Sequence, residues 1–170
     1  MVETEWKYLI GVQKTTKPNL EDTIHNYLDG DILRNALHFL SFLKENGMTP
    51  KWSATQTWHY KYKGKLIFTI RLHGSVRTWK VRTRSWHISS FHEHDVKYLE
   101  DFMQFDDNNE NKWLSISRCA NCGTCSPGID VRILGKTYNS VCRLEIINPD
   151  VEAIKVAKKL VLANKNALPK

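Results

Sequence analysis

Hydrophobic positions between residues 18 and 47 recur at the three- and four-residue spacing of amphipathic helices. Pro18-Asn19 is typical of a helix start, and Asp31 is a suitable N-cap for a second helix that runs to about Asn46. Gly47 follows where a left-handed residue commonly ends a helix. The two apolar stripes are Leu20, Ile24, Tyr27 and Leu28 in the first helix, and Leu33, Ala36, Leu37, Leu40 and Leu43 in the second.

From Trp52 to about Ile88 the hydrophobic period changes to two, which predicts antiparallel strands. A three-residue loop, 62–64, would pair Tyr60 with Leu66 and place Gly64 at a left-handed position. A two-residue loop would instead place Tyr60 opposite Ile67, so the three-residue loop is favoured because it gathers the apolar side chains. The expected core face is Trp58, Tyr60, Leu66, Phe68, Ile70 and Leu72. The expected opposite face is Thr55, Thr57, His59, Lys61, Lys65, Ile67, Thr69, Arg71 and His73.

The remaining pattern predicts an α+β fold with an antiparallel sheet and helices on one side. The other expected elements are an extended segment over 5–12, a strand over 79–88, a helix over 95–105, a strand over 113–117 and a hairpin over 131–134 and 141–147. A closing helix is expected after Asn148-Pro149, with Asn148 as its cap. Its predicted stripe is Val151, Ile154, Ala157 and Val161. The polar loop 106–112 is the expected boundary between parts 1–105 and 106–170 of one compact protein.

Length and composition are those of a globular domain, since 41% of the 170 residues are hydrophobic and 25% are charged. No apolar run approaches the ~18 residues of a membrane-spanning helix. The sequence begins with acidic residues where a signal peptide carries basic ones. We therefore expect a cytoplasmic protein with no membrane partner.

The net charge of +7 is concentrated in residues 51–90, which hold nine of the 25 Lys and Arg residues and no Asp or Glu. Such asymmetry favours an anionic partner, either a small molecule or a nucleic acid on which Trp86 would stack. A small aromatic ligand and an ordinary solvated sheet face are the alternatives. The candidate ligand-binding residues are His59, Lys61, Arg71, Lys80, Arg82, Arg84 and Trp86.

All four cysteines lie within 24 residues, as Cys119, Cys122, Cys125 and Cys142. In a reducing compartment this spacing predicts metal ligands, and four thiolates complete the tetrahedral shell of a structural Zn²⁺ site. The first three also fit part of a ferredoxin-type motif, so an iron–sulfur redox or sensor protein with Cys142 as the fourth ligand is the main alternative. Free or disulfide-bonded cysteines are the third possibility.

Three histidines, His87, His92 and His94, are candidates for a second metal site or an enzyme pocket if their side chains converge. A polar loop that leads into a helix capped by Asp95 accounts for the last two more simply. The sequence contains no Gly-rich phosphate loop and no Gly-x-Ser-x-Gly nucleophile motif. We therefore expect a protein without catalytic residues.

Several segments together resemble an uncharacterised family of small bacterial cytosolic α+β proteins with a C-terminal four-cysteine motif. These segments are the Tyr-Lys-Gly-Lys hairpin, residues 46–50, residues 86–89 and the cluster over 119–125. The resemblance covers residues 30–163. It implies a fold class and a compartment, and it implies no activity.

Overall fold

The computed structural model describes residues 11–74, 84–90, 114–118, 128–133 and 136–168. The chain divides into two compact units, residues 1–87 and 88–170, each of which is described by itself. Both contain helix and antiparallel strand, so the predicted α+β class is confirmed. No helix in these described ranges is long and apolar enough to cross a membrane. Residues 5–10, 79–83, 91–113 and Leu134, on which several predicted elements fall, lie outside the described residues.

The described part of the first unit starts with helical residues 11–16, so the predicted extended segment is wrong at Gly11 and Val12. Helix α2 (Leu20–Tyr27) starts as predicted, because the side chain of Asn19 accepts a hydrogen bond from the Glu21 N–H at 2.9 Å. Its predicted stripe is confirmed, since all four members are buried: Leu20, Ile24, Tyr27 and Leu28.

Helix α3 (Gly30–Glu45) starts one residue before the predicted cap, and Asp29 occupies the N-cap position in extended conformation. Asp31 lies in the first turn, where an acid stabilises the helix dipole, and it pairs with Arg34. The buried face is Ala36, Phe39, Leu40 and Leu43, whereas Leu33 and Leu37 are half-buried. Phe39 is therefore a core residue that the predicted stripe omitted. Gly47 has the predicted left-handed φ of 72°.

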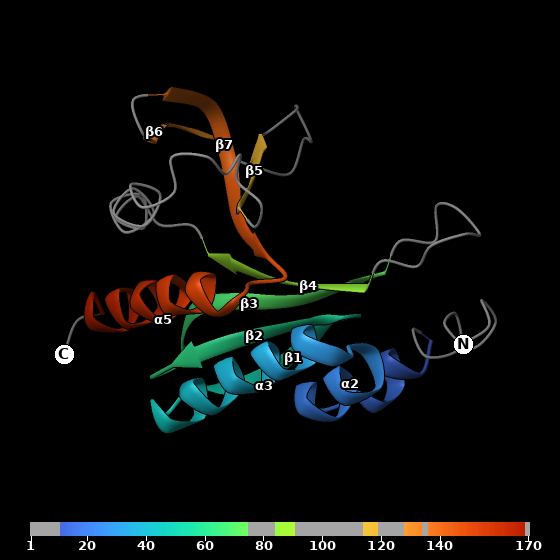
Figure 1. The fold of residues 1–170 in the computed structure, drawn as a ribbon. Coiled ribbons are helices and arrows are strands. Elements are labelled where there is room, and N and C mark those ends of the chain that lie inside the picture. The colour runs from blue at the N-terminus through green and yellow to red at the C-terminus, as the bar shows by residue number, and fades with distance from the viewer. Residues whose placement is uncertain (1–10, 75–83, 91–113, 119–127, 134–135, 169–170) are drawn as a thin grey trace. The chain divides into compact units, whose positions relative to one another are not determined.

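Three antiparallel strands follow in the order β1 (Thr49–Ala54), β2 (Thr57–Tyr62) and β3 (Lys65–Gly74). Figure 1 shows α2 and α3 against one face of these strands. The ring of Phe39 in α3 lies 6.0 Å from that of Phe68, which stacks on Tyr60 at 4.8 Å between centroids. Trp58 is also buried there, and its Nε1 donates to the Pro18 carbonyl at 3.0 Å. The core of this unit therefore lies between the helices and the Trp58 face of the strands.

The β2–β3 hairpin differs from both predicted registers. Tyr62 lies opposite Lys65, and the two loop residues, Lys63 and Gly64, both have positive φ (47° and 81°), as a type I′ turn requires. A β-bulge then makes Ile67 an extra residue, because Lys61 pairs with Leu66 and Tyr60 with Phe68. Because of this bulge, Trp58 and Tyr60 lie opposite Ile70 and Phe68 even though the loop has only two residues.

The bulge has direct consequences for burial. Five of the six predicted core residues are buried as expected: Trp58, Tyr60, Phe68, Ile70 and Leu72. Leu66 is 47% exposed, and Ile67, predicted on the opposite face, is 2% exposed. The prediction is therefore wrong for these two neighbours. Lys65 shares the face of its partner Tyr62, so its predicted place beside Lys61 is also wrong.

In the second unit, strand β7 (Lys136–Ile147) lies between β5 (Leu114–Arg118) and β6 (Ile129–Ile133) and pairs antiparallel with both. The predicted β6–β7 hairpin is confirmed, although β7 begins earlier than expected. Strand β4 (Arg84–Ser90) contains the boundary between the units and neighbours β7. The Ser89 hydroxyl donates to Glu145 Oε1 at 3.2 Å, which satisfies two buried polar groups.

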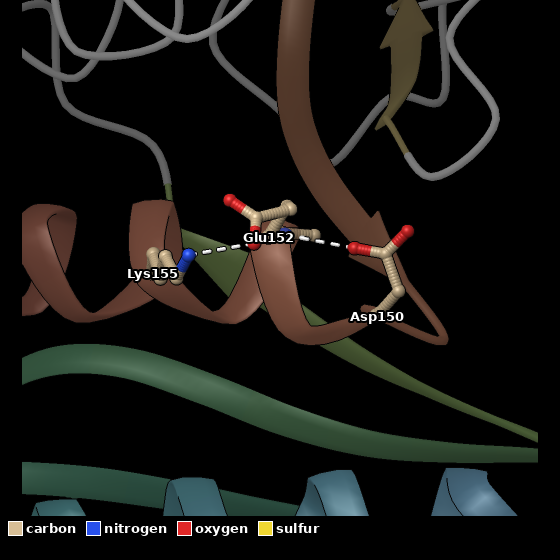
Figure 2. A network of polar contacts seen from close by, with 4 residues as sticks. Asp150, Glu152 and Lys155 are labelled. Carbon is tan, nitrogen blue, oxygen red and sulfur yellow. Dashed lines mark hydrogen bonds and ion pairs between the residues drawn. The ribbon is translucent and has the colours of Figure 1, made fainter.

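Helix α5 (Val151–Asn166) is capped by Asp150, whose carboxylate accepts from the Ala153 N–H at 2.9 Å (Figure 2). The predicted cap, Asn148, has a φ of 42° and lies before the helix, so that prediction is wrong. Lys155 Nζ donates to Glu152 Oε1 at 2.6 Å, and the figure draws this contact as well. Of the predicted stripe Ile154, Ala157 and Val161 are buried, whereas Val151 is 58% exposed.

Candidate functional site

One face of the first unit gathers cationic side chains from all three strands. Lys51 on β1 lies directly opposite His59 on β2, and Thr69 on β3 lies opposite His59 from the other side. Lys61 follows His59 on the same face, and Arg71 lies opposite Thr57. We call the set Lys51, His59, Lys61 and Arg71 the basic face. Three of its members were predicted from sequence to share a face, and the register places them together.

The basic face is only partly exposed. Lys51 and Lys61 are exposed, His59 and Arg71 are half-buried, and Thr69 between the strands is 8% exposed. Burial lowers the pKa of His59 below its ordinary value of 6.5, and the nearby charges of Lys61 and Arg71 lower it further. The face is therefore not the uniformly solvated sheet surface that was the simplest interpretation of its sequence.

Sequence reasoning did not assign Lys51 to this face, because the strand over 49–54 was not predicted to pair with β2. The alternation of apolar and polar residues around Trp52 was the only signal in the sequence for this strand. Of the other candidate ligand-binding residues, Lys80 and Arg82 lie outside the described residues. Arg84 and Trp86 lie on β4, and for these two residues the structure describes the backbone only.

Acidification should destabilise the folded protein through His59, because its pKa is lower in the folded state. We expect the free energy of unfolding to decrease as the pH falls from about 6.5 through the lower pKa of the folded state. The reason is that the unfolded chain takes up the proton first, while above pH 6.5 the histidine is neutral in both states. Thermal melts at a series of pH values should show a smaller decrease for His59→Gln. The exposed His25→Gln serves as the control, and a His59→Gln profile that matches it would contradict the prediction.

The second unit brings the ends of the cysteine-rich segment to one point of β7. Arg118, the last residue of β5, is paired with Val141, and Ile129, the first residue of β6, is paired with the same Val141 from the other side. Cys119 directly follows Arg118 in the chain. The two residues that flank 119–128 in the chain, Arg118 and Ile129, therefore both lie beside Val141, which directly precedes Cys142.

Two further backbone features mark this point. The β5–β7 register shifts from Ser117↔Arg143 to Arg118↔Val141, so Cys142 has no partner on β5 and forms a β-bulge. On the other edge, a Cβ built on Gly128 would lie 2.3 Å from the carbonyl of Ser140, which only glycine allows. Gly128 thus lies in close contact with the β7 backbone just before Cys142.

The other predicted ligands cannot be placed in the same way. Cys119, Cys122, Cys125, His92 and His94 lie outside the described residues, and Cys142 is described through its backbone. His87 is buried on β4. Within the described ranges, no group of three or more His, Cys, Asp or Glu side chains could hold a metal ion.

No protein-family model, curated protein or solved structure matches the chain. The resemblance to a bacterial four-cysteine family therefore stays a prediction from the sequence.

Proposed function

We propose that residues 88–170 form a structural zinc module in which Cys119, Cys122, Cys125 and Cys142 bind one Zn²⁺. The observation that carries the proposal is the double pairing of Val141. Arg118 and Ile129, which flank the three-cysteine segment, are both paired with this residue, and this supports a site in which the segment closes on the strand position adjacent to the fourth cysteine.

Chain connectivity supports the same arrangement. One residue spans at most about 3.6 Å, so Cys119 stays within one step of Arg118 and Cys125 within about 14 Å of Ile129. Neighbouring strands are about 4.8 Å apart, so the two ends of the segment are separated by about 10 Å across β7. These short stretches of chain allow all three cysteines to approach Cys142.

Four thiolates leave no open coordination position for substrate or water, and this property favours a structural over a catalytic role. The metal would hold the β5–β6 connection on β7, and its binding free energy would contribute to the folding of this unit.

Elemental analysis of the purified full chain, together with its visible spectrum, tests the proposal. We expect one zinc per chain and a colourless protein, and Cys142→Ser should lose the zinc while the exposed β7 control Thr137→Ser keeps it. If Cys142→Ser fails to fold, cobalt substitution of the unmutated chain provides a second test, since four thiolates give intense sulfur-to-cobalt absorption. A brown protein that contains iron and sulfide, or Cys142→Ser with full zinc content, would overturn the proposal.

A further inference from the structure

A cavity in the first unit carries an inference that depends neither on the cysteines nor on the basic face. The cavity is lined by residues of the helical segment 11–16, of its connection to α2 and of α2 itself, and it has a volume of about 160 Å³. We propose that it binds a single-ring aromatic amine that carries a hydrogen-bond acceptor at the end of the ring opposite the amine.

The size and the walls of the cavity fit one aromatic ring. Its lining is predominantly apolar and includes Val12, Pro18 and the buried Tyr27. Aromatic side chains pack favourably against other rings in offset or edge-to-face arrangements. An apolar cavity of about 150 Å³ holds one benzene molecule, whereas pockets for larger ligands and cofactors start at about 300 Å³. The volume therefore favours a single ring over a nucleotide or another ligand with several rings.

Gln13 supplies a hydrogen-bond donor at the buried part of the lining. The residue is 7% exposed, and its Oε1 accepts from the backbone N–H of Gln56 at 2.8 Å. This bond identifies the other end of the amide as the NH₂ group, which can only donate. In the part of the chain that the structure describes, that NH₂ group has no acceptor. Because a buried donor without an acceptor is destabilising, a ligand atom that accepts from Gln13 would be favoured here.

The exposed part of the lining offers acceptors instead. The hydroxyls of Thr16 and Thr23 already donate to backbone carbonyls at 2.9 and 2.7 Å, so their oxygens remain as acceptors. The Asn26 amide donates to the Asp22 carbonyl at 2.9 Å. The Asp22 carboxylate is exposed and takes part in no ion pair with the described residues. A protonated amine is the ligand group that satisfies a carboxylate and neighbouring acceptors together.

These two parts of the lining define the polarity of the ligand. The buried part donates and the exposed part accepts, so the ligand needs an acceptor inside the cavity and a cationic donor at its opening. The apolar remainder of the lining accommodates the ring. 4-(Aminomethyl)pyridine has this arrangement, because its ring nitrogen accepts a hydrogen bond and its amine is protonated at neutral pH.

Titration of the full chain with 4-(aminomethyl)pyridine, followed by NMR chemical shifts, tests the proposal. We expect saturable shifts within residues 12–27. Benzylamine lacks the ring nitrogen and should bind about tenfold more weakly, because the donor of Gln13 is then left without an acceptor. 4-Methylpyridine lacks the amine and should bind about threefold more weakly, the loss expected for one exposed ion pair.

Two variants test the two contacts separately. Gln13→Glu keeps an acceptor for the Gln56 N–H but removes the donor, so the preference for 4-(aminomethyl)pyridine over benzylamine should disappear. Asp22→Asn should weaken the binding of 4-(aminomethyl)pyridine about threefold and leave that of 4-methylpyridine unchanged. Glu21→Gln is the matched control for Asp22→Asn, because Glu21 is an exposed acid of α2 outside the cavity lining. It should change the affinity by less than about 1.5-fold.

If Gln13→Glu does not fold, the comparison of the three compounds on the unmutated chain decides the proposal. The absence of saturable shifts within residues 12–27, or equal affinities for the three compounds, would overturn it. Equal losses in Asp22→Asn and Glu21→Gln would also overturn it, because the amine would then respond to the general charge of α2 and not to a contact at the cavity.

Discussion

Phe68→Ala should lower the free energy of unfolding by about 3–5 kcal/mol, whereas Leu66→Ala should change it by less than about 0.5 kcal/mol. The two residues are two positions apart on β3, and simple alternation would place both in the core. The bulge at Ile67 separates them: Phe68 is fully buried against Tyr60 and Phe39, while Leu66 is 47% exposed. The difference between the two losses in free energy of unfolding therefore tests the register of the hairpin.

Urea denaturation of the two variants, at equal protein concentration, provides the measurement. Ile67→Ala gives a further check, because a regular hairpin with the three-residue loop 62–64 would leave that side chain out of the core, whereas it is 2% exposed. It should cost about 2–4 kcal/mol. Comparable losses in Leu66→Ala and Phe68→Ala would show that the hairpin pairs without a bulge.

Gly128→Ala should destabilise the second unit by about 3 kcal/mol, the upper end of the usual cost of overpacking. The added methyl group would lie 2.3 Å from both the carbonyl carbon and the carbonyl oxygen of Ser140 and 2.8 Å from the carbonyl oxygen of Val141. Backbone atoms cannot move aside as the end of a flexible side chain does, so β6 and β7 would have to separate locally. Thermal unfolding and amide exchange on β7 would report the loss.

Gly11→Ala is the matched control, because a Cβ at that position meets nothing within 4 Å. It should be neutral or stabilise the helix over 11–16 by about 0.5–1 kcal/mol. If Gly128→Ala is as stable as this control, the end of the cysteine-rich segment does not approach Ser140. The proposal that the segment closes on Cys142 would then lose its main support.

The local elements of this protein were largely predictable. Helix α2, most of α3, the β6–β7 hairpin and α5 follow from periodicity, capping residues and glycine, which act over a few neighbouring positions. The errors at the helix ends have local causes too. Asp29 and Asp150 cap their helices in place of Asp31 and Asn148, and each stretch contains more than one suitable capping residue.

The hairpin register was not predictable, because periodicity along one strand does not reveal a bulge. Which of Leu66 and Ile67 enters the core depends on the partner strand and on the aromatic side chains that α3 packs against Phe68. Lys51 was missed for the same reason, since its position beside His59 exists only when β1 pairs with β2.

For the candidate sites, the sequence by itself determined which chemistry is available: four cysteines at metal-ligand spacing, and a stretch of forty residues that is basic and free of acids. Tertiary structure alone decided which of these groups meet. The pairing of Val141 on both sides brings Arg118 and Ile129, which flank the cysteine-rich segment, to the same position of β7, and three strands in register collect cations that lie up to twenty residues apart. The reason is physical: ligand type and charge are properties of single residues, whereas proximity across a sheet is set by hydrogen bonding between distant segments.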